Sequence, residues 1–486
     1  MKESKSRKPK QQAGEADGAA PPKPRKGPSR RHFLASTAGL ILAGKAVGQE
    51  AAAPEAPAEA AAPEAPVAAP APIKRKGPGD DLHVALIGQG AQGRVLMESI
   101  LRIPNIRVKA LCDIWEYPQK RSSGMLRKYG HDVNVYEDYQ ELLAQEQDLD
   151  AAVIATPDFM HAEHAIACMR AGLDVYCEKE MSNDLGKARQ MVRTSRETGR
   201  LLQIGHQRRS NPRYHHAIDT LVRETGLLGR VTHAFAQWNR AKSDDLGWPK
   251  KYEIPPDRLE KYGYDSMHHF RNWRWYKKYG GGPIVDLGSH QIDIFAWVWG
   301  CNPKSVMADG GVNFYPNHEW YDNVMAIFEY DTDVGANRAF YQVLTTTSNG
   351  GFYETFMGEE GTLVISEVPD RGDHMLREAH AEDWEPYVKQ GLLMPLVTEA
   401  PEPSQNADIV ADVRDSPDLL SWPLPVRLNK PAHQPHLENF FDAIRHGVPL
   451  NCPGEMGYET AMAVLTVNKA VEVGRRIDFS PEDFEV

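Results

Sequence analysis

The chain has 486 residues, 41% hydrophobic and 25% charged, which is enough for two or three domains with buried cores and excludes a fully disordered chain. Its formal net charge is −11, and because residues 1–80 are rich in Lys and Arg, the remainder is more acidic still, which argues against nucleic acid or an anionic membrane as a partner. The five cysteines form no C-x-x-C pair, so we expect free buried thiols and no metal site.

The first 48 residues have the composition of an export signal. A basic stretch leads into Ser29-Arg30-Arg31-His32-Phe33-Leu34, and the modestly apolar run 35–48 follows. This resembles a twin-arginine signal, because paired arginines precede Phe and Leu and the apolar run is too short for a comfortable membrane span. We expect a periplasmic or otherwise exported protein with no stable membrane span after signal cleavage. The alternative is a chance arginine pair in a basic tail.

Residues 49–80 are composed largely of Ala, Pro and Glu, and the heptapeptide AAAPEAP occurs twice. Such a segment cannot bury a core, and its prolines favour extended conformations. We interpret it as a disordered linker that holds the globular part away from the membrane or wall. The globular part starts at about residue 81.

A glycine-rich turn follows the first predicted strand, His83–Ile87. The pattern Gly88-x-Gly90-x-x-Gly93 opens a predicted helix over Gln92–Arg102. Gly88 permits the tight turn, Gly90 lets a pyrophosphate approach the backbone, and Gly93 lets the helix pack on the strand. Free backbone N–H groups at the helix start, around Ala91 and Gln92, favour a phosphate. An ordinary strand-to-helix turn is the alternative.

An acidic residue ends the second predicted strand, Arg107–Cys112. Asp113 lies 20 residues beyond Gly93. A carboxylate there accepts hydrogen bonds from a ribose 2′-hydroxyl and repels a 2′-phosphate, so the sequence predicts NAD rather than NADP. A turn aspartate is the alternative.

Strands and helices alternate across residues 81–206, which predicts a doubly wound parallel Rossmann sheet. The predicted strands are 83–87, 107–112, 133–136, 151–155, 174–177 and 201–204. The predicted helices are 92–102, 119–129, 139–144, 162–171 and 185–198.

Ligands of such sheets bind outside the carboxyl ends of the strands, so the residues after each strand are candidates. Thr156 and Pro157 follow the fourth strand, and His161 stands near the next helix start, where it would meet the ribose or cap the helix. Glu178 and Lys179 follow the fifth strand.

Lys179 has a chemical role at this position. Its ammonium would hydrogen-bond a ribose hydroxyl and a substrate hydroxyl, and it would stabilise the oxygen as hydride leaves. The alternative is a surface lysine between two glutamates. Arg208 follows the sixth strand in a doubly basic turn and could hold sugar oxygens.

Beyond residue 207 the predicted strands, 231–238, 324–330, 338–346 and 362–366, lack regular intervening helices, which predicts a mostly antiparallel sheet. Residues 367–430 are Pro-rich and irregular, and we expect an insertion there. Helices are predicted over 436–446 and 456–473.

Two further stretches in this half carry candidate substrate residues. In His268–Tyr276 aromatic rings alternate with cations, so Trp273 and Tyr276 could form a wall for a sugar; a buried aromatic cluster is the alternative. On a predicted helix, Asp286, His290 and Asp293 have i, i+4 and i+7 spacing and share one face. An imidazole beside a carboxylate makes a general base near neutral pH.

Taken together, Gly88–Gly93, Glu178-Lys179 and Asp286-x-x-x-His290-x-x-Asp293 resemble the glucose–fructose oxidoreductase / inositol dehydrogenase / MocA (Gfo/Idh/MocA) family over about residues 81–486. The resemblance implies a Rossmann domain followed by an α/β domain, residues 207–486, whose large open-faced sheet builds a homodimer or homotetramer. It implies that Lys179, Asp286 and His290 are catalytic and that Arg208 and Asp293 contact the sugar or polyol. Where the family reads Glu-Lys-Pro, this chain has Glu180.

We therefore expect an NAD-dependent oxidoreductase that transfers hydride between a tightly bound cofactor and a sugar or polyol hydroxyl. Because little free NAD exists outside the cytoplasm, an exported enzyme of this type should keep and regenerate its cofactor. One alternative is an NAD-dependent glycoside hydrolase that uses transient oxidation, elimination and re-reduction. Another is a non-catalytic carbohydrate- or nucleotide-binding protein.

Overall fold

The computed structural model describes residues 77, 79–396 and 419–486. The predicted signal region 1–48 and nearly all of the predicted linker 49–80 therefore lie outside the described residues. Within the described ranges, no helix has the length and apolar character needed to cross a membrane.

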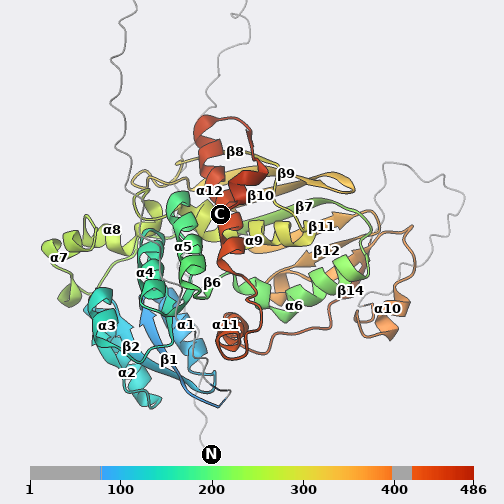
Figure 1. Ribbon diagram of the computed structural model, residues 1–486. Coiled ribbons are helices and arrows are strands. Elements are labelled where there is room, and N and C mark those ends of the chain that lie inside the picture. Colours follow the sequence, from blue (N-terminus) through green and yellow to red (C-terminus); the bar gives the residue numbers. More distant parts are fainter. Residues whose placement is uncertain (1–76, 78, 397–418) are drawn as a thin grey trace, which may run out of the picture. The chain divides into compact units, whose positions relative to one another are not determined.

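The first sheet contains six parallel strands in the order β3-β2-β1-β4-β5-β6. This is the predicted Rossmann arrangement, and its strand order reverses between β1 and β4, where such folds bind their ligands. Figure 1 shows two of the strands, β1 and β2, side by side. The strands are β1 Leu82–Ile87, β2 Ile106–Cys112, β3 Asn134–Tyr136, β4 Ala151–Ile154, β5 Asp174–Cys177 and β6 Leu202–Ile204.

The connecting helices begin and end within four residues of their predicted limits, because strong local signals set them. In α5, the Asp184 side chain accepts a hydrogen bond from the Lys187 N–H, and Gly199 ends the helix in the left-handed conformation. The helices are α1 Ala91–Ile100, α2 Glu116–Lys128, α3 Tyr139–Gln145, α4 Asp158–Arg170 and α5 Leu185–Thr198.

The second sheet contains nine strands in the order β14-β13-β12-β11-β7-β10-β9-β8-β15. Only the β7–β10 pair is parallel among these strands, so the predicted mostly antiparallel sheet is confirmed. The strands are β7 Val231–Asn239, β8 Ser305–Gly311, β9 Asn323–Thr332, β10 Gly335–Leu344, β11 Phe352–Gly358, β12 Gly361–Ile365, β13 Asp373–Arg377, β14 Leu420–Pro423 and β15 Ile477–Asp478.

The predicted insertion at 367–430 is wrong in part. The strands β13 and β14 extend the second sheet, because the buried Met375 and Trp422, which pair across them, pack into its core. The short helix α10 Glu385–Lys389 also lies in this stretch, while residues 397–418 lie outside the described residues.

The remaining helices lie between β6 and the C-terminus. They are α6 Pro212–Tyr214, which continues as a π-helix over His215–Glu224, α7 Pro256–Lys261, α8 Met267–Arg271, α9 Gly282–Trp299, α11 Gln434–His446 and α12 Gly454–Val473.

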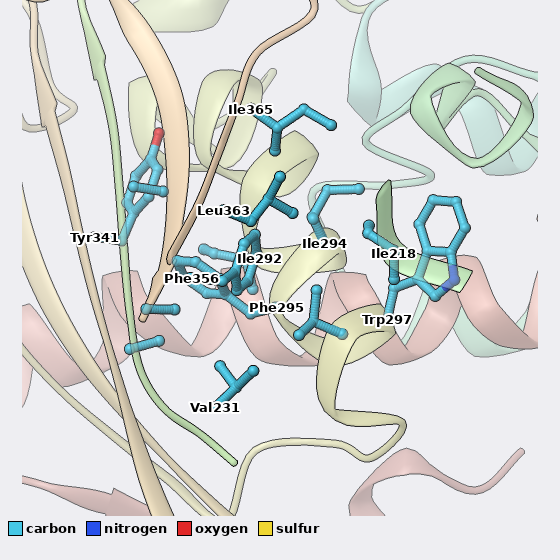
Figure 2. Packing of buried hydrophobic residues seen from close by; sticks show 14 of the residues in the cluster. Ile218, Val231, Ile292, Ile294, Phe295, Trp297, Tyr341, Phe356, Leu363 and Ile365 are labelled. Carbon is cyan, nitrogen blue, oxygen red and sulfur yellow. The ribbon is translucent and has the colours of Figure 1, made fainter. Parts of the chain in front are cut away.

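The helix α9 supplies much of the core on one face of the second sheet. Figure 2 shows Phe295 and Ile292 of α9 packed against Phe356 and Leu363 from the sheet. All four side chains are almost fully buried. This packing fixes α9 against the sheet, and with it every side chain that α9 presents elsewhere.

The last two helices return to the Rossmann sheet. Helix α12 contacts α5 and β6 as well as β8 and α9, so it joins the two sheets. Leu437, Phe440 and Phe441 of α11 pack with strands β1 and β5 in a separate core. The chain beyond residue 430 therefore completes the Rossmann core, although it is remote in sequence.

We expect Phe440→Ala to lower the free energy of unfolding by about 3–5 kcal/mol, because it would leave a cavity where a fully buried ring packs between α11 and the sheet. Urea unfolding followed by tryptophan fluorescence measures this. Phe314→Ala is the matched control, since that ring is 47% exposed and its loss should change stability by less than about 1 kcal/mol. Equal effects of the two substitutions would contradict the packing role of α11.

Candidate active site

A cavity of about 1510 Å³ lies at the carboxyl end of the Rossmann strands. It is lined by the Gly88–Gln92 turn and Asp113 from the first sheet, and by Asp286 and His290 from α9. Pockets for one small molecule are typically about 300–1,000 Å³, so this cavity has room for two ligands side by side.

The glycine turn is shaped for a phosphate-bearing ligand. Gly88 has φ +86°, and a Cβ there would lie 2.7 Å from the backbone of Ala155. At Gly93 a Cβ would collide with the Gly88 carbonyl oxygen, whereas at Gly90 it would meet nothing within 4 Å. Gly93 therefore serves helix packing and does not line the cavity. Gly90 leaves the backbone open where α1 begins, which fits a pyrophosphate.

Asp113 stands at the end of β2 with its carboxylate held in place. Its oxygens accept hydrogen bonds from the N–H groups of Gln89 at 2.7 Å and Trp115 at 2.8 Å. Burial raises the pKa of this carboxyl to about 6, although the two N–H groups act in the opposite direction. The group is ionised at neutral pH and lines the cavity, so it fits the hydroxyls of a ribose.

Lys179 and Asp286 meet at the cavity wall, although Lys179 follows strand β5 of the first sheet and Asp286 lies on helix α9. Lys179 Nζ lies 3.3 Å from Asp286 Oδ1 and also donates to the Asp286 carbonyl oxygen. Arg274 Nε lies 3.2 Å from the other carboxylate oxygen. Burial acts to raise the pKa of Asp286, but the charges of Arg274, Lys179 and Arg240 outweigh it and hold the pKa below its usual value.

His290 lies one helical turn beyond Asp286 and is 8% exposed. Its ring centroid is 5.5 Å from that of Trp238, and its Nδ1 atom has no hydrogen-bond partner among the described residues. Burial, reinforced by the charge of Lys179, holds the pKa of the imidazole well below its usual value. The ring is therefore neutral at pH 7 and able to accept a proton.

The predicted cofactor residues at the next strand ends also reach the cavity. Thr156, Pro157 and Glu178 line it. Gln92 Nε2 lies 2.9 Å from Glu178 Oε1 and 2.9 Å from His433 Nε2, so α1, the end of β5 and the start of α11 are joined there. The peptide bond between Lys179 and Glu180 is cis.

His161 does not line the cavity. It is 1% exposed, and its ring nitrogens lie 2.7 Å from the carbonyl oxygens of Glu180 and Thr156. Burial lowers the pKa of this imidazole to about 4. The predicted contact with the ribose is wrong, because His161 instead ties together the two strand ends that carry Thr156 and Lys179.

Arg208 does not contact the cavity either, so its predicted role as a direct substrate contact is wrong. Its side chain is 1% exposed and forms ion pairs with Glu354 and, at 3.4 Å, with Glu367. Glu367 lines the cavity and also accepts a hydrogen bond of 2.9 Å from Gln207. Arg208 therefore orients a carboxylate that itself faces the ligand space.

Asp293 and Tyr276 are likewise buried away from the cavity, and their predicted substrate contacts are wrong. Asp293 is 1% exposed and accepts hydrogen bonds from Arg209 Nε at 2.8 Å and Thr460 at 3.1 Å. The Tyr276 hydroxyl lies 3.2 Å from His268 Nδ1. Trp273 does line the cavity, with the Arg274 guanidinium 4.3 Å above its ring.

Residues 240–279, which we call the strap, connect β7 to α9 and lie across the nucleotide end of the cavity. Tyr264 and Phe270 of the strap line the same cavity as Asp113. The strap has its own core with Trp115, whose Nε1 donates to the Tyr252 carbonyl oxygen at 2.6 Å. Other strap residues in this core are Ile254, Leu259, Met267 and Tyr279.

Polar contacts also hold the strap to the Rossmann sheet. Arg258 donates to Glu137 at 2.5 Å and to the Ile114 carbonyl oxygen at 3.2 Å. The Tyr262 hydroxyl donates to the other Glu137 oxygen at 3.0 Å. The strap is therefore anchored beside the ends of β2 and β3.

Sequence reasoning missed several residues that line the cavity, namely Asp158, Trp238, Arg240, Arg274 and Glu367. Asp158 is 4% exposed, and burial together with the charge of Asp286 raises its pKa to about 7. Four of the five stand at or just after the end of a predicted strand, which is the signal that could have found them. Within the described part of the chain, no group of three or more His, Cys, Asp or Glu residues is placed to hold a metal ion.

Two family models match the chain and together cover more than half of it. Residues 82–206 match the oxidoreductase family with an NAD-binding Rossmann fold, and residues 217–364 match the GFO/IDH/MocA C-terminal domain. The match of the first domain confirms the predicted cofactor class.

Curated relatives agree with the family models. Inositol 2-dehydrogenase of Rubrobacter xylanophilus is 30% identical over 181 residues, which is 37% of this chain and 50% of that protein. A glycosyl hydrolase family 109 protein of Stenotrophomonas maltophilia is 30% identical over 227 residues, 43% of this chain and 48% of that protein. The chain thus spans about half the length of these curated relatives.

A solved structure shares the fold. The WlbA dehydrogenase of Bordetella pertussis, in complex with NADH and UDP-GlcNAcA, has a TM-score of 0.59 and 19% identity over 82% of this chain and 99% of that one. From the glycine turn, the two sheets and the matched domains, we conclude that the chain belongs to the Gfo/Idh/MocA oxidoreductase family.

Proposed function

We propose that this protein is an NAD-dependent oxidoreductase that removes hydride from a hydroxyl-bearing carbon of a sugar or polyol. The observation that carries the proposal is the meeting of Lys179, Asp286 and His290 in one cavity with the glycine turn and Asp113. Bound NAD would supply the hydride acceptor, and Gly90, Asp113, Thr156 and Glu178 are the residues that would hold it.

The chain's own residues divide the remaining chemistry. The neutral His290 imidazole accepts the hydroxyl proton of the substrate. The Lys179 ammonium donates a hydrogen bond to the same oxygen and stabilises the negative charge that develops on it. Asp286 holds the Lys179 side chain in place through its ion pair.

Net hydrolysis of a glycoside is the second candidate. Oxidation at one sugar carbon acidifies the neighbouring C–H bond, so the leaving group can be eliminated before water and hydride return. The likeness to a family 109 glycosyl hydrolase favours this alternative, as does a strap that would retain the cofactor through the cycle.

We further propose that the cofactor stays bound between turnovers. The strap buries a tryptophan and several tyrosines against the Rossmann side of the cavity, and Arg258 and Tyr262 anchor it to Glu137. A cofactor held beneath these residues could leave only if part of the strap opened.

Export through the twin-arginine route is proposed from Arg30-Arg31 and the apolar run that follows. A retained cofactor is consistent with this route. Cell fractionation that finds the chain among cytoplasmic proteins would contradict the proposal.

Association of copies through the second sheet is also proposed. Met307, Ile327, Phe340 and Phe235 form a row across β8, β9, β10 and β7, and all four side chains share one face. Met307 is 49% and Ile327 41% exposed, so this apolar row is left partly uncovered by the residues that the structure describes. A solution mass equal to one chain would argue against a dimer or tetramer.

We expect His290→Ala and Lys179→Met each to lower kcat by about 10²–10⁴-fold, because each removes one of the two groups that handle the substrate oxygen. The assay follows the absorbance of reduced nicotinamide and the release of free sugar from a panel of polyols and glycosides. Sugar release without net cofactor reduction identifies the hydrolase.

His446→Ala is the matched control for His290→Ala, since this histidine is exposed at the end of α11. Its activity should equal that of the unaltered chain. Unchanged activity in both site variants would instead favour a binding protein without catalysis.

The lowered pKa of His290 predicts the pH dependence. The imidazole works as a base only when neutral, and its pKa lies below the usual value, so activity is lost only when pH falls through that lower pKa. We therefore expect no decrease in kcat/KM from protonation of His290 at any pH above about 6. Asp158→Asn removes a carboxyl group whose pKa is about 7. If kcat/KM of this variant still fell as the pH was lowered through about 7, the prediction for His290 would be contradicted.

The strap predicts slow cofactor exchange. Arg258→Ala removes the contacts to Glu137 and the Ile114 carbonyl, and a loss of about 1 kcal/mol should speed dissociation about fivefold. Mass spectrometry of denatured protein, sampled after mixing with isotopically labelled NAD, measures the exchange. Arg476→Ala, which removes an exposed arginine paired far from the strap, should leave the rate unchanged. Exchange complete within the mixing time in the unaltered chain would disprove retention.

A further inference from the structure

Arg240 is a cation that lines the cavity without a carboxylate of its own. It follows the last residue of β7, is exposed, and stacks with its guanidinium 5.4 Å from the centre of the Trp238 ring. Across the described residues its side chain forms no ion pair or hydrogen bond at contact distance. An arginine in a ligand cavity with free donors is available to a ligand.

Two carboxylates of the same cavity, Asp286 and Glu367, already have other cationic or polar partners. Asp286 already pairs with both Lys179 and Arg274, and Arg240 adds its field to the same carboxylate. Three cations thus act on one acidic group. Glu367, on the same cavity, is held by Arg208 and Gln207.

The position of Arg240 relates it to the reacting end of the cavity. The centre of the Trp238 ring is 5.4 Å from the Arg240 guanidinium and 5.5 Å from the centre of the His290 ring, so both groups border the same tryptophan in the cavity wall. A sugar whose hydroxyl meets His290 and Lys179 would therefore carry another of its substituents towards Arg240. The planar guanidinium binds carboxylate, sulfate and phosphate oxygens in pairs.

We propose that the substrate is an anionic sugar, bearing a uronate carboxylate or a sulfate or phosphate ester, and that Arg240 recognises the anionic group. This inference rests on the proposed function and adds to it the class of sugar. Arg274, stacked on Trp273 and paired with Asp286, contributes to the same positive field.

The test compares a neutral methyl glycoside with the corresponding methyl uronide, 6-sulfate and 6-phosphate, measuring reduction of the bound cofactor and, separately, binding by calorimetry. The unaltered chain should prefer at least one anionic sugar by about tenfold or more in kcat/KM, mostly through KM. Arg240→Gln should reduce this preference to about one, and Arg240→Lys should restore part of it. Whichever of the uronide, the 6-sulfate and the 6-phosphate is preferred identifies the anionic group as a carboxylate, a sulfate ester or a phosphate ester.

Two controls isolate the charge at position 240. Lys242→Gln neutralises a nearby exposed cation that stacks on Phe314 and does not line the cavity, so the preference should be unchanged. Asp244→Asn removes an acidic residue from the cavity wall and should strengthen anion binding. Circular dichroism checks that each variant is folded.

The outcomes separate the two proposals. If neutral and anionic sugars react alike, the anionic substrate is wrong while the oxidoreductase stands. If Arg240→Gln keeps the anionic preference, the recognition of the anionic group by Arg240 is wrong while the oxidoreductase stands. If no sugar reduces the cofactor or is hydrolysed, the proposed function fails, and calorimetry still decides whether Arg240 binds an anionic sugar. Absence of such binding overturns the inference.

Discussion

The ion pair between Lys179 and Asp286 is the interaction on which the site depends. Lys179 follows strand β5 of the Rossmann sheet, and Asp286 stands on α9, which packs on the second sheet. Arg274 of the strap binds the same carboxylate. Three separately folded parts of the chain therefore converge on one acidic group. Buried charges are costly when unpaired, so loss of any one partner leaves the others in an unfavourable position.

The position of α9 is what brings this carboxylate to the cavity. Phe295 and Ile292 fix the helix on the sheet, and Asn468 of α12 donates to the Gly281 carbonyl oxygen at 2.7 Å where α9 starts. Because α12 also packs on α5, the same helix helps to set the spacing between Lys179 and His290. A rigid support of this kind is what general acid–base chemistry needs.

The sequence predicts the Rossmann half well because its signals are local. The apolar strands are short, glycines mark the turns, and Asp113 closes the second strand. The second sheet is harder, since strands such as β8 and β13 mix polar and apolar residues, and their pairing depends on partners far along the chain. Met375 and Trp422 reveal a sheet edge only once they are packed together.

Assigning single residues fails where two neighbours look alike. Arg208 and Arg209 are adjacent residues of the same type. In the structure Arg208 forms an ion pair with the buried Glu354, and Arg209 forms one with the buried Asp293. Helical spacing correctly groups Asp286 with His290. It also adds Asp293, which lies two turns from Asp286 and faces Arg209 instead of the ligand space. Residue type alone does not distinguish a cavity wall from a buried contact, because both use the same residue types.

The strap links the two ends of the cavity physically. It begins at Arg240 and includes Trp273 and Arg274 at the substrate end, while Tyr264 and Phe270 lie at the nucleotide end. We expect a segment anchored at both termini and through its own aromatic core to open as a unit, since opening one end would expose Trp115 and the tyrosines packed on it. Opening the strap wide enough for the dinucleotide would therefore also withdraw Arg274 from Asp286. The proposed retention of the cofactor and the pairing of Arg274 with Asp286 would thus depend on the same closed state of the strap, so a chain that holds its cofactor in this way would also keep this end of the cavity formed.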